Sequence, residues 1–359
     1  MKPILYSANE TDFSHCGLGV LNDCISCEVY EELNGQFELT IRYPVNGVLF
    51  EELSTDKIIV AKPSKTRENQ AFRIYSVKKT SNNSATIKAE HVSYRLKDII
   101  VKPIAASTLG RAFEHLKNNA YSGEHPFVFE SEIDTSEIEP FSVGSPTSIK
   151  KLLADEDYSV RTVWGGELEY DNYTVWLRNK RGVDNGFRIA YAKNMTGITC
   201  QETMQDVYTA CVAYYQGVDE NNNEIVVVSD MQFSENPLSY NREMAYDASA
   251  EYDYTPSVEN LNITAQEFLA KADKEPYLIV SVDFVNLGDS EEYKAFKKLE
   301  TVEIGDTVKI YHPLYNIDIS ARVVSTTFDA LMERYTSVDV GRRKVNISDT
   351  LSGVLAKLY

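Results

Sequence analysis

The sequence lacks any long run of apolar residues, and none approaches the roughly 20 residues that a membrane-spanning helix needs. The first residues, Met1–Tyr6, also lack the apolar core and the small-residue cleavage site of a secretory signal. We therefore expect no membrane segment and synthesis in a cytosol.

Positive charge and cysteine are both scarce. The 36 lysines and arginines face 54 aspartates and glutamates, for a net charge of -18, which repels a phosphate backbone and argues against specific nucleic-acid binding. Five cysteines are too few and odd in number for a disulfide framework, so we expect reduced, mostly packed thiols. They are Cys16, Cys24, Cys27, Cys200 and Cys211.

The length and the tyrosine content indicate a globular protein of several compact units that is rich in β-structure. A chain of 359 residues suits several compact units, and its 43% hydrophobic and 25% charged residues are typical of globular proteins. The 23 tyrosines outnumber 14 phenylalanines and 2 tryptophans. Tyrosine favours strands and half-wet interfaces, so we expect a β-rich protein that makes contacts.

The first hundred residues predict a small β-barrel or sandwich. Asn34-Gly35 is a strong hairpin turn signal, and it separates a strand at Cys27–Tyr30 from one at Phe37–Tyr43, where apolar and polar residues alternate. Three further short strands follow between polar turns. They are predicted at 57–61, 71–77 and 85–89.

The pattern changes to a mixture of helices and strands after Lys102-Pro103. Leu109, Phe113 and Leu116 recur at helical spacing behind Ser107-Thr108, and a second helix is predicted at Ile149 behind Ser145–Ser148. Strands are predicted at 160–164, 167–170 and 174–177, so this stretch is expected to form an α+β unit.

A second β run starts near Asn194. Val207–Tyr215 allows a helix or a strand, but its Val, Thr and Tyr content favours a strand that pairs with 224–228 in a hairpin. One helix is predicted at Thr264–Ala272. Strands are then predicted at 277–284, 307–311, 317–327 and 335–340.

Three groups of phrases resemble a known family, the phage and prophage tail proteins called prophage endopeptidase tail, phage minor structural proteins that include the N-terminal hub region of tail-associated lysins. The first group is Leu21–Val29 with Glu31–Gly35, and the second is Ala89–Leu96. The third joins Ile304–Val308, Ala321–Val324 and Glu333–Gly341, and the three span nearly the whole chain.

The resemblance implies a mainly β fold with α+β insertions, built from two antiparallel β-barrel hub domains and two smaller α/β decorations. The expected parts are 1–101 as the first barrel, 102–194 as an α+β insertion, 195–245 with 300–346 as the second barrel, 246–299 as a small α/β insertion, and 347–359 as a C-terminal helix. A baseplate hub of this kind sits at the virion tail tip and is made in the bacterial host cytoplasm.

The resemblance also implies partners and signature residues. A homotrimer would form a pseudo-sixfold ring that contacts the distal tail protein and other tail-tip proteins and lets tape-measure protein or DNA pass. The residues that carry the likeness are structural: Asn34, Gly35, His91, Tyr94, Gly305, Asp306, Arg322, Glu333, Arg334 and Tyr335.

Each signature also has a simpler explanation. Gly305-Asp306 is typical of a tight turn between strands, and Arg322 with Glu333 and Arg334 is compatible with an ordinary ion-pair cluster on a barrel rim. His91 is expected to be a hydrogen-bonded structural histidine rather than a catalytic one.

Catalytic and metal-binding patterns are weak. No nucleophile elbow, papain-like cysteine phrase, metalloprotease motif, P-loop or dinucleotide fingerprint occurs, so we expect no enzyme and no cofactor; in the family, lytic activity resembles a separate domain that would lie beyond Tyr359. Cys24 and Cys27 are predicted on one strand, where a spacing of three puts side chains on opposite faces and disfavours zinc. The histidines are His15, His91, His115, His125 and His312.

Two other function classes stay open. A carbohydrate-binding module of the tail requires exposed aromatic platforms, for which Trp164, Tyr173 and Trp176 are the local candidates, although strand alternation explains them equally well as core. A peptidoglycan endopeptidase requires a catalytic group assembled across space.

The C-terminal residues show a short heptad pattern. Ile347, Leu351, Val354 and Leu358 are spaced by four, three and four, behind Ser348 or Asp349 as a cap. We hypothesise a three-stranded stalk that leads to an absent domain; the alternative is a helix packed on the second barrel.

Overall fold

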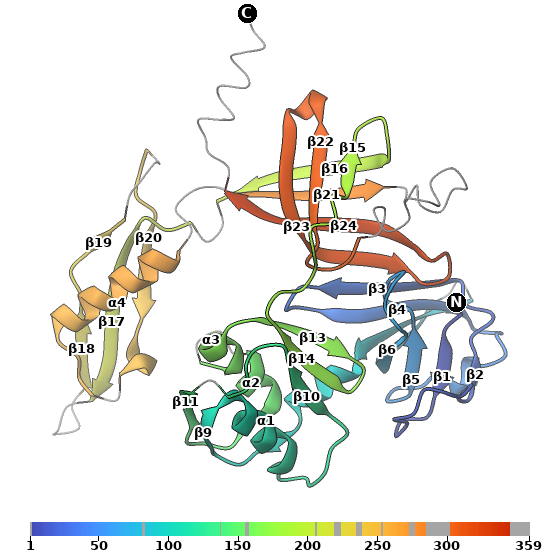
Figure 1. Ribbon diagram of the computed structural model, residues 1–359, viewed down its shortest axis with the longest axis horizontal. Helices are drawn as coiled ribbons and strands as arrows, with labels where there is room; N and C mark the ends of the chain where they lie inside the picture. Colours follow the sequence, from blue (N-terminus) through green and yellow to red (C-terminus); the bar gives the residue numbers. More distant parts are fainter. Residues whose placement is uncertain are drawn as a thin grey trace, which may run out of the picture. The chain divides into compact units, whose positions relative to one another are not determined.

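The computed structural model describes residues 2–80, 83–136, 138–154, 158–204, 207–218, 224–234, 239–252, 254–272, 277–284 and 302–344. The fold is mainly β, as predicted, with 47% strand and 16% helix. The chain forms two compact units, one built from Met1–Thr199 with Ser281–Gly341 and the other from Cys200–Val280 (Figure 1).

The largest sheet contains the predicted hairpin. Strands β3 (Ser26–Glu32) and β4 (Phe37–Pro44) pair antiparallel. Asn34 adopts the left-handed backbone conformation, with a φ of 58°, which explains why an Asn-Gly pair stands at this turn. The predicted alternation on β4 is confirmed, since every second side chain is buried. These side chains are Phe37, Leu39, Ile41 and Tyr43.

This sheet joins the beginning and the end of the chain. Its thirteen strands follow the order β16-β21-β24-β23-β3-β4-β7-β6-β5-β1-β2, and β22 with β15 is attached at β23. The central pairing is β23 against β3, where Phe328 faces Val29. The strands not yet bounded are β1 (Ile4–Tyr6), β2 (Gly19–Val20), β5 (Ile58–Ala61), β6 (Gln70–Thr80), β7 (Ser84–His91), β15 (Arg188–Ala190), β16 (Met195–Thr203), β21 (Tyr277–Phe284), β22 (Thr307–His312), β23 (Ile317–Asp329) and β24 (Arg334–Lys344).

Within the described residues, the strand pairings of this sheet form an open path. The first predicted barrel, 1–101, and the 300–346 part of the second thus contribute strands to one sheet, in which β3 pairs with β23. Closure of either part into a barrel stays a prediction.

The α+β part of the first unit holds both predicted helices. Helix α1 (Leu109–Asn118) begins at Thr108, whose Oγ1 accepts a hydrogen bond from the Arg111 amide. Helix α2 (Ile149–Ala154) follows Ser148. Small sheets accompany them. Their strands are β8 (Ile100–Val101), β9 (Ile104–Thr108), β10 (Val128–Ser131), β11 (Ile138–Val143), β12 (Thr147–Ser148), β13 (Glu167–Asp171) and β14 (Thr174–Arg178).

The strand predicted at 160–164 is wrong, because these residues form helix α3 (Val160–Trp164). Ser159 and Thr162 make a reciprocal capping box at its start, and Gly165, with a φ of 75°, ends it. Val160 and Trp164 are four residues apart and both buried on one helix face. The β-branched residues of this five-residue segment favour a strand, but the capping box at its start and Gly165 at its end favour a helix, and the capping residues decide.

The second unit is a small sheet covered by one helix. Strands β17 (Ala210–Val218) and β18 (Glu224–Val228) form the predicted hairpin, and β19 (Gln232–Phe233) and β20 (Glu243–Asp247) also pair with β17. Helix α4 (Val258–Lys271) contains the predicted helix but begins earlier, at the Ser257 cap. Its buried residues pack on the sheet as a separate core. They are Leu261, Ala265 and Leu269, against Cys211 and Ala213.

This separate core differs from the predicted grouping of 195–245 with 300–346. Strands β17 to β20 pair only among themselves in the described chain, because α4 supplies the apolar face that they need. The predicted stalk residues Ile347, Leu351, Val354 and Leu358 lie outside the described residues. None of the described helices is both long and apolar enough to cross a membrane.

Candidate functional site: a buried charge junction

A buried carboxylate, Glu31, lies at the centre of the first unit. Cys27, Val29 and Glu31 share the inward face of β3, so the strand alternation places a charge where an apolar residue is expected. Glu31 is only 4% exposed. Its Oε2 accepts a hydrogen bond from Arg67 Nη1 at 2.5 Å, and its Oε1 accepts one from Arg181 Nη2 at 2.8 Å.

The two guanidiniums keep Glu31 ionised. Burial alone raises the pKa of Glu31, but Arg67 and Arg181 outweigh this effect, and the net pKa lies below the ordinary glutamate value. Burial lowers the pKa of Arg67, whereas the Glu31 carboxylate more than compensates, so this pKa is raised. A buried charge is tolerated only with such partners, which makes this set of residues mutually dependent.

A second ion pair lies beside the first. Arg322 on β23 donates from Nη1 and Nη2 to the two carboxylate oxygens of Glu167 on β13, at 2.6 and 2.9 Å. The backbone amide of Arg181 also donates to Glu167, at 2.7 Å. Burial raises the pKa of Glu167, but the hydrogen bonds and positive charges of Arg322 and Arg181 lower it by more. The pKa of Glu167 is therefore below its ordinary value.

The Gly305-Asp306 turn completes the arrangement. Gly305 has a φ of 87°, and its carbonyl accepts from Arg322 Nε at 3.1 Å. The buried Asp306 carboxylate accepts from the amides of Val183, at 2.7 Å, and Glu303, at 2.9 Å. We call this set the charge junction; its members are Glu31, Arg67, Glu167, Arg181, Asp306 and Arg322.

The structure brings four of the signature residues to this region: Asn34, Gly305, Asp306 and Arg322. Asn34 Oδ1 accepts from the amide of Leu168 on β13, at 3.1 Å, so β13 is held by Asn34 and by Arg322. The Tyr94 hydroxyl accepts from the Phe37 amide at 3.1 Å. The buried Tyr335 hydroxyl donates to the Val302 carbonyl at 2.5 Å, and burial raises the pKa of Tyr335 well above its ordinary value.

The suggested cluster of Arg322, Glu333 and Arg334 is not formed. Glu333 lies in the turn between β23 and β24, where its carboxylate is 3.4 Å from Lys62 Nζ, and Arg334 opposes Asp329 in the strand register. Arg322 lies seven residues before Asp329 on β23 and pairs with Glu167 instead. Gly35 serves the hairpin turn, as expected, through a hydrogen bond from its amide to the Glu32 carbonyl at 3.1 Å.

His91 is a structural histidine, as predicted. Its Nδ1 is 2.9 Å from Ser93 Oγ and its Nε2 is 3.1 Å from Gln70 Oε1, while its ring stacks on Phe37 at 4.4 Å. Burial, with smaller contributions from Arg67 and Lys150, lowers the pKa of His91 well below its ordinary value. Both residues of this serine–histidine pair are buried.

The predicted separation of Cys24 and Cys27 is wrong. Cys24 precedes β3 rather than lying on it, and a hydrogen bond with Cys24 is the largest of the causes that raise the pKa of the buried Cys27 thiol. Across the described part of the chain, no three His, Cys, Asp or Glu side chains gather as metal ligands. Of the five free cysteines only Cys27 and Cys211 are buried, fewer than expected.

The three candidate platform aromatics face different partners. Trp164 is 8% exposed and packs on Phe141, with ring centroids 5.6 Å apart. Tyr173 stacks on Phe13. Arg178 covers the Trp176 ring at 4.1 Å. They do not form a shared sugar-binding surface.

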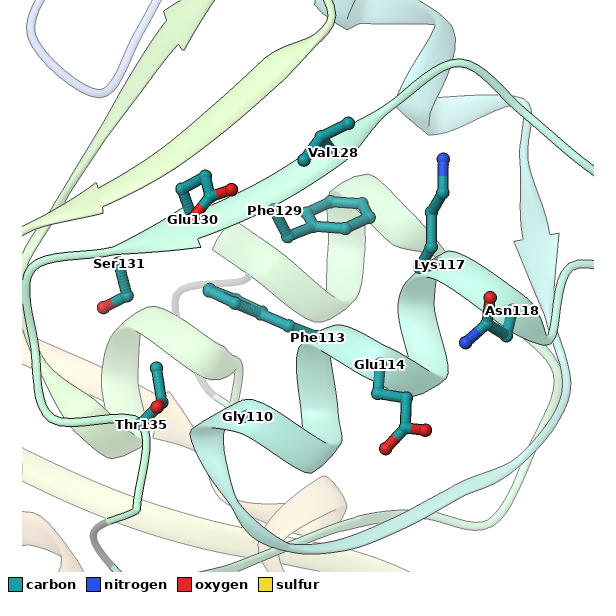
Figure 2. Close-up of a pocket in the computed structure, with 10 residues that line it drawn as sticks. All are labelled: Gly110, Phe113, Glu114, Lys117, Asn118, Val128, Phe129, Glu130, Ser131 and Thr135. Carbon is teal, nitrogen blue, oxygen red and sulfur yellow. The ribbon is translucent and has the colours of Figure 1, made fainter.

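One open hollow of about 350 Å³ lies between α1 and β10 (Figure 2). Phe113 and Phe129 point into it. Lys117 donates to the His125 and Phe127 carbonyls and Ser131 Oγ accepts from the Ile133 amide, so both side chains are engaged with the backbone. Glu114 and Glu130 also line the hollow, and both are exposed.

Solved structures of prophage tail proteins resemble the whole chain. The prophage MuSo2 43 kDa tail protein of Shewanella oneidensis aligns with a TM-score of 0.62 and 11% identity, over 95% of this chain and 98% of its own. The fold is that of prophage tail proteins. Prophage tail protein gp18 of Listeria monocytogenes aligns with a TM-score of 0.55 and 17% identity, over 100% and 99%.

A tail protein from Neisseria meningitidis shows the same likeness, with a TM-score of 0.56 and 9% identity over 96% of both chains. No family model and no curated protein matches the sequence. The three alignments thus cover at least 95% of this chain, with identities between 9% and 17%.

Four junction residues were not among the predicted sites: Glu31, Arg67, Glu167 and Arg181. Of these four, only Glu31 could have been found from the sequence, because it continues the alternation that places Cys27 and Val29 on the inward face of the strand.

Proposed function

We propose that this chain is a structural hub protein of a bacteriophage or prophage tail tip. The observation that carries the proposal is the end-to-end likeness to three tail proteins, which covers at least 95% of this chain. The resemblance of the sequence phrases to the tail-hub family supports it independently.

The charge junction suits a structural role that fixes the shape of the subunit. Arg322 and Glu167 pair β23 with β13, and Arg181 connects them to β3, because its side chain pairs with Glu31 and its backbone contacts both Glu167 and Arg322. The buried Glu31 pairs specify one arrangement, because a wrong arrangement leaves a buried charge unpaired. A hub needs a fixed subunit shape, since every copy in a ring must present the same edges to its neighbours.

The finer parts of the proposal concern assembly. Three chains form a ring at the virion tail tip, contact the distal tail protein and other tail-tip proteins, and leave a passage for tape-measure protein or DNA. The chain is made in the bacterial cytoplasm and acts without a cofactor or catalytic group. The C-terminal heptad residues would form the stalk on the ring axis.

Molar mass in solution tests this proposal. Light scattering across a concentration series is expected to reach three times the 40.6 kDa chain mass, and electron microscopy of that species is expected to show rings with threefold symmetry. Replacing Leu351 and Leu358 with aspartate should dissociate the trimer into monomers without changing the thermal midpoint. A chain that stays monomeric at the highest concentration, alone and with its tail-tip neighbours, contradicts the hub.

A further inference from the structure

The hollow between α1 and β10 runs along the edge of a strand. From α1, its lining residues recur at spacings of three, one, three and one, which is a single helix stripe: Gly110, Phe113, Glu114, Lys117 and Asn118. From β10 it is lined by the four consecutive residues Val128–Ser131. One face of a strand presents only alternate residues, so lining by consecutive residues requires an edge.

This edge of β10 has no partner among the strands that the structure describes. The three-stranded sheet has the order β10-β14-β13, and β10 pairs in parallel with β14 alone. The amides of Val128 and Glu132 donate toward that partner, to Tyr173 and Leu177 carbonyls at 2.9 and 3.0 Å. Because backbone groups alternate along a strand, those of Phe129 and Ser131 point to the open edge.

The walls of the hollow define the chemistry of an occupant. The Phe113 and Phe129 rings, with centroids 5.8 Å apart, form an apolar wall. Glu114 and Glu130 are exposed and lie on opposite sides of the hollow (Figure 2). The ammonium of Lys117 donates to two neutral backbone carbonyls rather than to either carboxylate. The lining therefore holds two carboxylates against one ammonium, a net negative charge.

We propose that an extended segment of a partner protein adds to β10 as a fourth strand of this sheet. Its backbone pairs with Phe129 and Ser131, an apolar side chain packs on Phe113 and Phe129, and basic side chains face Glu114 and Glu130. A strand fits better than a helix, because the open edge offers the outward backbone groups of Phe129 and Ser131 at the two-residue spacing of a strand. The charge complementarity selects a basic partner segment, and the proposal holds whether or not the chain forms a ring.

A blocked heptapeptide that alternates lysine and valine is the probe. Fluorescence anisotropy with the full chain is expected to show saturable binding that weakens with salt. The double variant Glu114→Lys with Glu130→Lys should lower the affinity about tenfold, because two favourable charge contacts become repulsive. The matched control, Glu51→Lys with Glu139→Lys, reverses two exposed charges outside the hollow and should bind as the unchanged chain does.

Backbone methylation separates strand addition from loose charge adsorption. In an extended peptide that alternates lysine and valine, all lysine amides point to one edge and all valine amides to the other. N-methylation of the set that faces β10 should abolish binding. N-methylation of the set that faces away should preserve it. Peptide binding should also slow hydrogen exchange of residues 128–131.

Three results overturn the proposal: equal binding by both methylated peptides, unchanged affinity of the Glu114→Lys, Glu130→Lys variant, or no peptide binding together with a changed molar mass of that variant. The last result would show that a second copy of the chain occupies this edge. Thermal midpoints confirm that each variant is folded.

Discussion

The guanidinium of Arg322 donates a hydrogen bond to each carboxylate oxygen of Glu167, with Nη1–Oε1 and Nη2–Oε2 distances of 2.6 and 2.9 Å. The two residues are 155 positions apart and belong to different sheets. Arg322 also donates to the carbonyls of Arg181 and Gly305, so four hydrogen bonds converge on one planar group. A lysine ammonium has neither the reach nor the fork geometry to replace it.

Arg322→Lys should therefore destabilise the first unit. We expect the free energy of unfolding to fall by about 1.5–3 kcal/mol, the usual range for hydrogen bonds to charged groups. The control is Arg178→Lys, whose partners Glu132 and Glu169 are 43% and 22% exposed, against 16% for Glu167, and it should cost about 0–1 kcal/mol. Urea unfolding measures both, and equal losses would refute a special role for Arg322.

Gly182→Ala should be far more harmful than Gly186→Ala. Both glycines have a positive φ, 74° and 77°, so each substitution carries a backbone cost of about 1 kcal/mol. A Cβ on Gly182 would also lie 2.0 Å from the Gly305 carbonyl carbon, whereas Gly186 has no atom within 4 Å of that position. We expect Gly182→Ala to disrupt the Gly305-Asp306 turn and lower the thermal midpoint well beyond its control. Similar midpoints would show that the two loops separate readily.

Glu31→Gln should remove a pH-dependent part of the stability. The pKa of Glu31 is depressed in the fold, so its ionised form stabilises the protein above about pH 4, the ordinary glutamate range, and this contribution is lost as the pH falls below it. At pH 7 the variant leaves Arg67 and Arg181 without their shared carboxylate, at a cost of about 3–5 kcal/mol. Its stability should also fall less steeply with acid than that of the unchanged chain.

Glu303→Gln should act in the opposite direction. Burial raises the pKa of Glu303, so the folded state binds the carboxyl proton more tightly than the unfolded state does. The protonated Glu303 therefore contributes fully to stability below about pH 4, and this contribution declines as the pH rises through the raised pKa. We expect the neutral amide to increase the thermal midpoint at pH 7 and to leave it unchanged at pH 4. A lower midpoint at pH 7 would mean that the ionised Glu303 is favourable.

The purified chain should release no peptidoglycan fragments above a heat-killed control. His91 and Ser93 lie 2.9 Å apart but are buried, and in the hollow beside α1 the side chains of Lys117 and Ser131 are engaged in backbone contacts. Hydrolysis of cell-wall substrate that disappears when one of the five histidines is changed to alanine would contradict this expectation.

Local chemistry explains which elements the sequence predicts correctly. The Asn34-Gly35 turn, the alternation on β4 and the cap at Thr108 each depend on residues a few positions apart, and every one is found in the structure. The error at 160–164 has the same origin, because a five-residue segment satisfies two local patterns and only its caps decide between them.

Tertiary structure alone decided the charge junction, the separate core of β17 to β20 and the open edge of β10. Each depends on residues that are far apart in the chain: Glu31 lies 36 positions from Arg67 and 150 from Arg181. Any of the 54 carboxylates is chemically able to pair with any of the 36 cations, so composition does not select the partners. Burial selects them, because a carboxylate placed inside β3 is stable only where the fold brings two guanidiniums to it.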